Sequence, residues 1–157
     1  MDADEAEVVR YASPMHDVGK VAIPDVILLK PGPLTPEQRE VMQRHTIVGA
    51  EIFKNAEDEI LATARAVALH HHERWDGKGY PHGLKEYAIP FPARITALAD
   101  VFDAILSRRC YKDACPLDVA LDIIDKETGE HFDPDIVKAF FGILDDVLEG
   151  YPALKAA

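Results

Sequence analysis

The chain has 157 residues, of which 48% are hydrophobic and 29% charged, a composition typical of one folded domain and not of a disordered segment. Its 17 basic and 28 acidic residues give a net charge of −11, which argues against a basic surface for duplex nucleic acid. A local cluster of metal ions with lysine or arginine can still bind an anionic small molecule. No apolar run reaches the roughly 18 residues that a membrane span needs. The two cysteines favour a reducing cytoplasm as the location.

Hydrophobic residues recur at helical spacing through most of the chain, and no pattern with the two-residue period of a strand is present. Asp4 followed by Glu7 predicts the start of a first helix. This helix is expected to end at His16 and Asp17, with a kink at Pro14.

A second long helix is predicted to begin after Thr35, which can cap it. Pro36 suits the first helical position and Gln38 can complete a capping box. The helix is expected to run to about Asn55. Its predicted inner face consists of Val41, His45, Val48, Gly49 and Ile52.

A helix over residues 57–72 follows. Residues 73–92 hold three glycines and three prolines, so they are predicted to form a long irregular loop. A loop of this length in a compact domain is usually functional. Helices resume over residues 93–107, 116–127 and 134–149. The predicted architecture of residues 1–157 is therefore one all-α domain.

Six ionisable side chains fall on or beside the inner faces of four of these helices. They are His16, Asp17, His45, His71, His72 and Asp100. Burying so many ionisable groups is costly unless they pair or coordinate a metal ion, and helix bundles build metal sites from facing helices. Imidazole and carboxylate ligands suit iron, manganese, nickel or zinc, and the lack of a nearby thiolate argues against a structural zinc site.

Six ligands exceed what one catalytic ion needs. We therefore predict two divalent transition-metal ions about 3.5–4 Å apart with Asp17 as the bridging ligand, a type of site that hydrolyses phosphate esters. Iron or manganese is favoured over nickel or zinc. Lys20 follows Asp17 by three residues and is expected to hold a phosphate oxygen or the attacking hydroxide; a solvated lysine near a helix end is the alternative.

These residues lie in strings that resemble a known family. The run from His16 to Lys20 resembles the signature of the HD phosphohydrolase superfamily, and the run from His71 to Pro81 resembles the defining motif of its HD-GYP branch. The resemblance covers the chain from about Asp4 to Leu144. Further matching strings are Ile23-Pro24-Asp25, Lys30-Pro31-Gly32, Ala99-Asp100-Val101-Phe102-Asp103-Ala104 and His131-Phe132-Asp133-Pro134.

The resemblance implies an HD-domain helical bundle and a bacterial metal-dependent phosphodiesterase that hydrolyses the second messenger cyclic di-GMP to the linear dinucleotide or to GMP. It implies that the six side chains above are metal ligands and that Asp17 and Lys20 are catalytic. The residues implied to contact the substrate are Lys20, Gly79, Tyr80, Pro81, Arg109 and Lys112. Docking of a diguanylate cyclase on the Gly-Tyr-Pro loop and a homodimer are further expected partnerships.

Some positions depart from the family pattern, and they bear on function. Cys110 stands where the family usually has proline, and Glu86 stands where glycine is common. The family's first helices lie upstream of the HD pair, whereas 15 residues precede His16, so the chain is expected to lack those helices. One ion would then be held by His45, His71 and His72 with Asp17, and the other by His16, Asp17 and Asp100.

Two other functions stay open. One is an HD phosphohydrolase that acts on a different nucleotide, against which the Gly-Tyr-Pro loop argues. The other is a non-catalytic module that binds cyclic di-GMP or docks a protein. The intact set of six ligands argues against that second function, because docking alone needs none of them.

Overall fold

The computed structural model describes residues 1–107 and 115–149. Over these ranges the all-α prediction is confirmed, and the one pairing of extended backbone is an isolated bridge between Thr128 and Phe132. No helix in the described ranges is both long enough and apolar enough to cross a membrane. The elements in chain order are α1 (Ala3–Ala12), η1 (Ser13–Met15), η2 (Val18–Ala22), α2 (Asp25–Leu28), α3 (Pro36–Ile52), α4 (Glu59–His70), η3 (Glu86–Ala88), α5 (Phe91–Leu106), α6 (Leu117–Lys126), α7 (Pro134–Gly142) and α8 (Leu144–Glu149), where η marks a short 3-10 helix.

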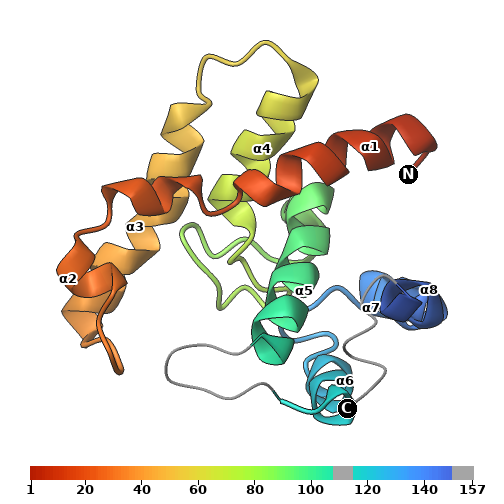
Figure 1. The fold of residues 1–157 in the computed structure, drawn as a ribbon. Coiled ribbons are helices and arrows are strands. Elements are labelled where there is room, and N and C mark those ends of the chain that lie inside the picture. The colour runs from red at the N-terminus through yellow and green to blue at the C-terminus, as the bar shows by residue number, and fades with distance from the viewer. Residues whose placement is uncertain (108–114, 150–157) are drawn as a thin grey trace.

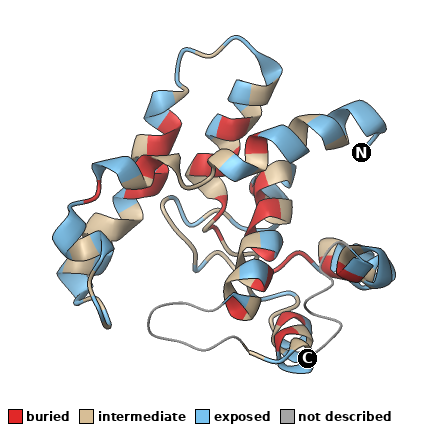
Figure 2. Cartoon of the chain, in the orientation of Figure 1, coloured by how far each residue is buried: buried red, intermediate tan, exposed pale blue. Residues whose placement is uncertain are grey.

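Helix α4 lies at the centre of the N-terminal part of the fold. It packs against α1, α3, α5 and η1, while η2 lies along α3 (Figure 1). Buried residues gather on the sides where α3, α4 and α5 face one another (Figure 2). The other end of α5 packs against α6 and α7 around an aromatic and aliphatic core that includes Phe102, Ile124, Phe132 and Phe140. Helix α5 therefore joins the two halves of the core.

Helix α1 begins earlier than predicted. The amide of Glu5 donates to the Asp2 carboxylate and the amide of Asp2 donates to the Glu5 carboxylate, both at 2.9 Å, which forms a capping box around Ala3. The predicted start at Asp4 is therefore wrong. The pattern Asp4 to Glu7 has the same spacing, but only the earlier pair lies at the helix end.

Helix α1 also ends earlier than predicted, at Ala12. Ser13–Met15 form a 3-10 turn with Pro14 near its start, since proline has no amide hydrogen to extend the α-helical bonding. His16 and Asp17 therefore lie between two 3-10 turns and not at the end of an α-helix, which corrects the prediction.

Helix α3 begins as predicted. The Gln38 amide donates to the Thr35 hydroxyl oxygen and the Gln38 side chain accepts from the Thr35 amide. His45 and Gly49 are buried on its inner side, as predicted. The helix ends at Ile52, before the predicted Asn55, and Ile52 is 50% exposed because it borders the largely exposed connection to α4. The prediction that Ile52 lies on the inner face is therefore wrong.

Helices α4, α6 and α7 are shorter than predicted, whereas α5 begins two residues before the predicted start and has 16 residues. Asp58 caps α4 by accepting from the amides of Ile60 and Leu61, so the helix spans Glu59–His70 and not residues 57–72. Residues 134–149 form two helices and not one. The break is at Ile143, whose backbone leaves helical geometry with φ −115° and ψ 14°.

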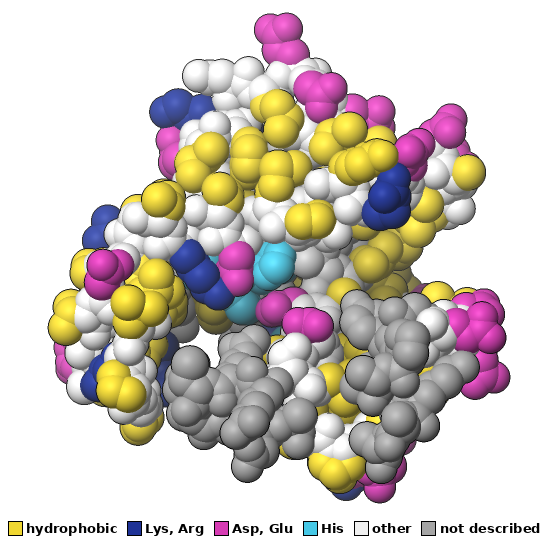
Figure 3. All heavy atoms as spheres, in the orientation of Figure 1, with side chains coloured by type: hydrophobic (Ala, Val, Ile, Leu, Met, Phe, Trp, Pro, Cys, Tyr) yellow, Lys and Arg dark blue, Asp and Glu magenta, His cyan; other side chains and the backbone are white. Residues whose placement is uncertain are grey.

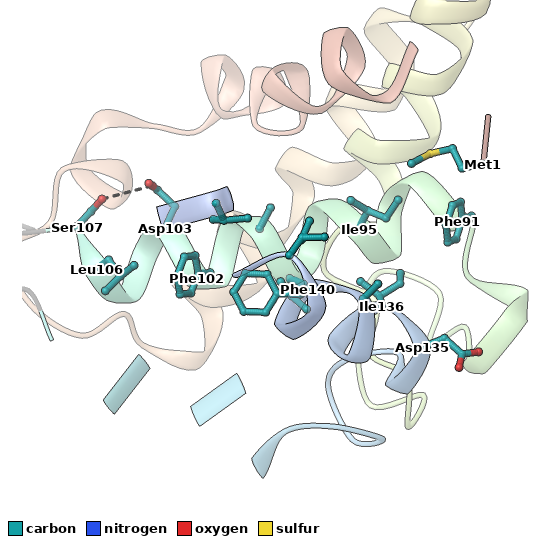
Figure 4. Close-up of a pocket in the computed structure, with 15 residues that line it drawn as sticks. Met1, Phe91, Ile95, Phe102, Asp103, Leu106, Ser107, Asp135, Ile136 and Phe140 are labelled. Atoms are coloured by element: carbon teal, nitrogen blue, oxygen red, sulfur yellow. Dashed lines mark hydrogen bonds between the residues drawn. The ribbon is translucent and has the colours of Figure 1, made fainter. Parts of the chain in front are cut away.

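An apolar cavity of about 610 Å³ lies between α5, α7 and α8 (Figure 4). The charged residues that line it, Asp103 and Asp135, are both acidic, and none of the six predicted ligands lines it. A doubly anionic dinucleotide would meet mainly apolar side chains and two carboxylates there. The larger apolar side chains of its wall are Phe91, Ile95, Phe102, Ile136, Phe140 and Val147.

Candidate metal centre

The six predicted ligands come from separate parts of the chain that meet beside α4. His16 and Asp17 lie between η1 and η2, His45 lies in α3, His71 and His72 directly follow α4, and Asp100 lies in α5. Figure 3 shows histidine side chains at the centre of one face of the molecule, flanked by basic and acidic side chains. The structure thus brings together residues that are up to 84 positions apart in the chain, from His16 to Asp100.

Asp17 lies at the centre of this group. Its Oδ1 atom is 3.4 Å from His45 Nε2 and 3.9 Å from His71 Nε2, and its Oδ2 atom is 3.3 Å from His16 Nε2. Oδ1 is buried and accepts no hydrogen bond from the described residues. A buried carboxylate oxygen is costly without a partner, and a cation between it and the imidazoles would supply one.

The histidine rings are held with one nitrogen toward the centre. Nδ1 of His16, His45 and His71 lies 2.8–2.9 Å from a backbone carbonyl of its own segment. A carbonyl only accepts, so Nδ1 carries the ring proton, and in the neutral ring Nε2 faces the cluster with its lone pair. The carbonyls belong to Ser13, Met42 and Val67, respectively.

Three of the histidines are neutral at pH 7. Burial, with neighbouring imidazoles, lowers the pKa of His71 to about 4 and the pKa of His72 to about 3. Burial also lowers the pKa of His45. Neutral imidazole is the form that binds a metal ion, so burial keeps these rings in the form that can act as ligands.

His16 has a different environment. The carboxylates of Asp100 and Asp17 lie 3.7 and 3.3 Å from its Nε2 atom, and they raise the pKa of His16 to about 10. A metal ion at this position would have to displace that proton. Asp100 and Asp17 are therefore the carboxylate neighbours of His16 on one side of the cluster.

The chemistry of the donors fits a divalent metal ion. Asp17, His45, His71 and His72 each offer one ligand atom within 4.8 Å of the others. This set of imidazoles with a carboxylate suits borderline transition metals, and the Asp17 Oδ1 atom has no hydrogen-bond partner among the described residues. The cluster could hold a divalent metal ion.

The Lys20 side chain lies at the edge of the cluster. Its Nζ atom forms a short ion pair with Asp17 Oδ2, and 40% of the side chain is exposed. The ammonium group is thus both held by Asp17 and reachable from solvent. Arg109 and Lys112, predicted to contact the substrate, and Cys110 lie outside the described residues.

The predicted Gly-Tyr-Pro loop lies beside the cluster. The Tyr80 ring stacks on the His72 ring with centroids 4.7 Å apart, and the Tyr80 amide donates to the His72 carbonyl at 3.2 Å. Burial raises the pKa of the Tyr80 hydroxyl, so that group stays neutral. A Cβ atom at Gly79 would lie 2.3 Å from the Arg74 nitrogen, so only glycine fits where the loop returns to the cluster.

Glu73 organises this loop, a role that was not predicted. Its side chain is 0% exposed, and its two oxygens accept from the amides of His82 and Leu84 at 2.8 and 3.0 Å. The carboxylate therefore joins the end of α4 to the residues that follow Pro81. The signal in the sequence is an acidic residue directly after two histidines and before a loop rich in glycine.

Comparison with known proteins shows that the chain has relatives among phosphodiesterases of cyclic dinucleotides. The chain is 47% identical over 143 residues to a cyclic di-GMP phosphodiesterase of Thermotoga maritima, covering 91% of this chain and 39% of that protein. It is 47% identical over 139 residues to the cyclic di-GMP phosphodiesterase response regulator RpfG of Xanthomonas campestris, covering 88% and 37%. A 3'3'-cGAMP-specific phosphodiesterase 2 of Vibrio cholerae is 45% identical over 134 residues, covering 85% and 26%. The chain spans about two-fifths or less of the length of these relatives.

The fold has a counterpart among solved structures. A crystal structure of a cyclic GMP-AMP-specific phosphodiesterase of Vibrio cholerae, V-cGAP3, superposes with a TM-score of 0.65 at 19% identity, covering 92% of this chain and 39% of that one. At that identity the likeness shows the fold alone. The family described as HD domain matches residues 1–136. The chain therefore belongs to the HD domain family, in line with the resemblance carried by His16 and Asp17.

Proposed function

We propose that the chain is a metal-dependent phosphodiesterase that hydrolyses cyclic di-GMP to linear pGpG, to GMP or to both, in bacterial signalling. The observation that carries the proposal is the position of Asp17, whose two oxygens face imidazoles from three segments of the fold. Relatives that are 47% identical and bear the name cyclic di-GMP phosphodiesterase support this substrate. We take residues 1–157 as one HD-GYP domain and place its reaction in the cytoplasm.

The proposed cofactor is a pair of divalent ions, iron or manganese in preference to nickel or zinc. His45, His71 and His72 would hold one ion with Asp17, and the other would be held by His16, Asp17 and Asp100. Bound ions of this kind supply a nucleophile at neutral pH and neutralise charge on the phosphate oxygens.

The protein's own groups prepare the phosphate for attack. The Lys20 ammonium group, beside Asp17 Oδ2, would donate to a phosphate oxygen on which negative charge grows during the reaction. The Tyr80 ring stacks on His72 and shields one face of that proposed ligand from water. Gly79 and Pro81 fix the position of Tyr80, while Arg109 and Lys112 stay proposed contacts for the second phosphate and a guanine base.

The proposed partners other than substrate involve the same loop. Docking of a diguanylate cyclase would use the Gly-Tyr-Pro segment, and a homodimer is proposed as the assembly.

A relative specific for 3'3'-cGAMP makes this mixed dinucleotide the main competing substrate. Cyclic di-GMP is preferred because a relative that is 49% identical also bears that name.

The test is an anaerobic assay of the full chain loaded with Mn²⁺ or Fe²⁺, with products separated by HPLC. Cyclic di-GMP, 3'3'-cGAMP and noncyclic nucleotides are offered in parallel. Asp17→Asn is expected to lower kcat by at least about 100-fold because it weakens a proposed metal ligand. Asp25→Asn, a change of the same type at an exposed position, is expected to leave kcat unchanged. Loaded protein that cleaves none of the cyclic dinucleotides would refute the proposal.

A further inference from the structure

A second group of ligand-type side chains lies outside the six-residue cluster. His70, Glu73 and His82 each offer one atom within 4.8 Å of the others. The His70 Nδ1 atom is 3.8 Å from Glu73 Oε1, and the His70 and His82 ring centroids are 5.5 Å apart. His70 is the last residue of α4 and His82 follows the Gly-Tyr-Pro segment, so the group joins the helix to the loop.

The charge of Glu73 lacks a strong partner. Its side chain is completely buried, and both oxygens accept from backbone amides, which carry no net charge. Within residues 1–107 and 115–149, no lysine or arginine forms an ion pair with it, and the two histidines of the group, His70 and His82, lie beside it. A buried carboxylate normally pairs with a cation or binds a metal ion.

His70, beside Glu73, also has a polar atom without a partner. Its Nδ1 atom is buried and has no hydrogen-bond partner among the described residues, although it faces the Glu73 carboxylate. A buried ring nitrogen without a partner loses its bond to water and gains nothing in return. One cation between Nδ1 and Oε1 would satisfy the nitrogen lone pair and the carboxylate charge together.

His82 is the third member of the group. Its side chain is exposed, while its amide is fixed by Glu73. Nitrogen and oxygen ligands around a tetrahedral zinc ion lie about 3.4 Å apart, given bonds of about 2.0–2.1 Å. The His70 Nδ1–Glu73 Oε1 distance of 3.8 Å would therefore shorten by about 0.4 Å, and the exposed His82 ring would turn toward both atoms. The remaining coordination position would open to solvent.

We propose that His70, Glu73 and His82 form a further binding site for a divalent ion of the zinc class, which fastens the loop after Pro81 to the end of α4. The site does not depend on the activity proposed above, and its ligands differ from the six described there. Its effect would extend to Tyr80, because the same loop segment carries that ring onto His72.

The test compares Zn²⁺ uptake by the full chain, by His82→Ala and by His131→Gln, at a free Zn²⁺ concentration that just saturates the unmodified protein. His82 is exposed, so its loss leaves the fold intact, and His131 is the one histidine that belongs to neither cluster. We expect His82→Ala to bind one ion per chain fewer, by elemental analysis, and His131→Gln to match the unmodified protein. Equal uptake by His82→Ala and the unmodified protein would overturn the proposal.

Amide hydrogen exchange is a second measurement, made on the loop that carries the proposed site. Addition of Zn²⁺ is expected to slow amide exchange at residues 82–84 in the unmodified protein and in His131→Gln, but to a much smaller degree in His82→Ala. An equal slowing in all three proteins would show that ions at the six-residue cluster alone order the loop. Glu73 and His70 would then form only a histidine–carboxylate pair, and the site would be excluded.

Discussion

The backbone of Gly19 lies directly against the backbone carbonyl of His45. A Cβ atom at position 19 would lie 1.9 Å from that oxygen and 2.5 Å from the Gly49 nitrogen, so η2 can approach α3 only because the residue has no side chain. This approach sets Asp17, two residues earlier, 3.4 Å from His45 Nε2. The contact between two backbones thus fixes the distance between two proposed ligands.

Gly19→Ala is therefore expected to damage both stability and the metal centre. The added methyl group must push η2 away from α3, and overpacking of this kind costs about 1–3 kcal/mol of unfolding free energy. Urea unfolding measures the loss. Gly142→Ala is the control, since a Cβ atom there meets nothing, and it should change stability by less than about 1 kcal/mol. A Gly19→Ala protein as stable as the control would contradict this packing.

His72→Ala is expected to lose metal and activity together. The change removes a proposed ligand and the surface on which Tyr80 stacks. We expect the Mn²⁺ content to fall by about one ion per chain and kcat to fall by at least about 100-fold. His131→Ala should keep both values. Full turnover by His72→Ala would show that His72 does not bind a catalytic ion.

Lys20→Met is expected to separate catalysis from metal binding. Removal of the ammonium group takes away a donor to the phosphate but leaves every proposed ligand in place, so kcat should fall by about 100-fold with little change in metal content. Lys20→Arg should recover part of kcat. Lys54→Met, at an exposed ion pair with Glu51, should match the unmodified protein. Loss of metal without a specific loss of kcat would assign Lys20 a structural role at Asp17.

Asp133 is expected to be a major source of stability. Its side chain is 1% exposed, pairs with Arg94 of α5 and caps α7 by accepting from the Asp135 amide. Asp133→Ala breaks a buried ion pair and leaves Arg94 without its partner, at a cost of about 3–5 kcal/mol, to which the lost cap adds about 1 kcal/mol. Asp133→Asn keeps the cap, so its melting temperature should lie between those of Asp133→Ala and the unmodified protein. Equal melting of Asp133→Ala and the unmodified protein would contradict this.

Local signals in the sequence predicted the positions of the candidate ligands. Thr35 and Gln38 lie three residues apart and cap α3 without help from the rest of the fold. From that start, helical spacing places His45 on the inner side. His71 follows in the same way from the apolar face of α4, and the structure brings both rings to Asp17.

Other features depend on contacts that spacing alone does not determine. Asp2–Glu5 and Asp4–Glu7 are equivalent capping patterns, and the structure selects the first. The end of α3 before Asn55 likewise has no strong signal in the chain. The role of Glu73 depends on the path of the loop that returns His82 and Leu84 to it, which is a long-range property.

The most direct test of the proposed catalytic centre is anomalous X-ray diffraction from crystals of the full chain grown with Mn²⁺. Two anomalous peaks about 3.5–4 Å apart are expected, with Asp17 between them, His45, His71 and His72 around one, and His16 and Asp100 at the other. The absence of a peak among these six side chains, in protein shown by elemental analysis to contain Mn²⁺, would contradict the proposed metal centre and the hydrolysis that depends on it.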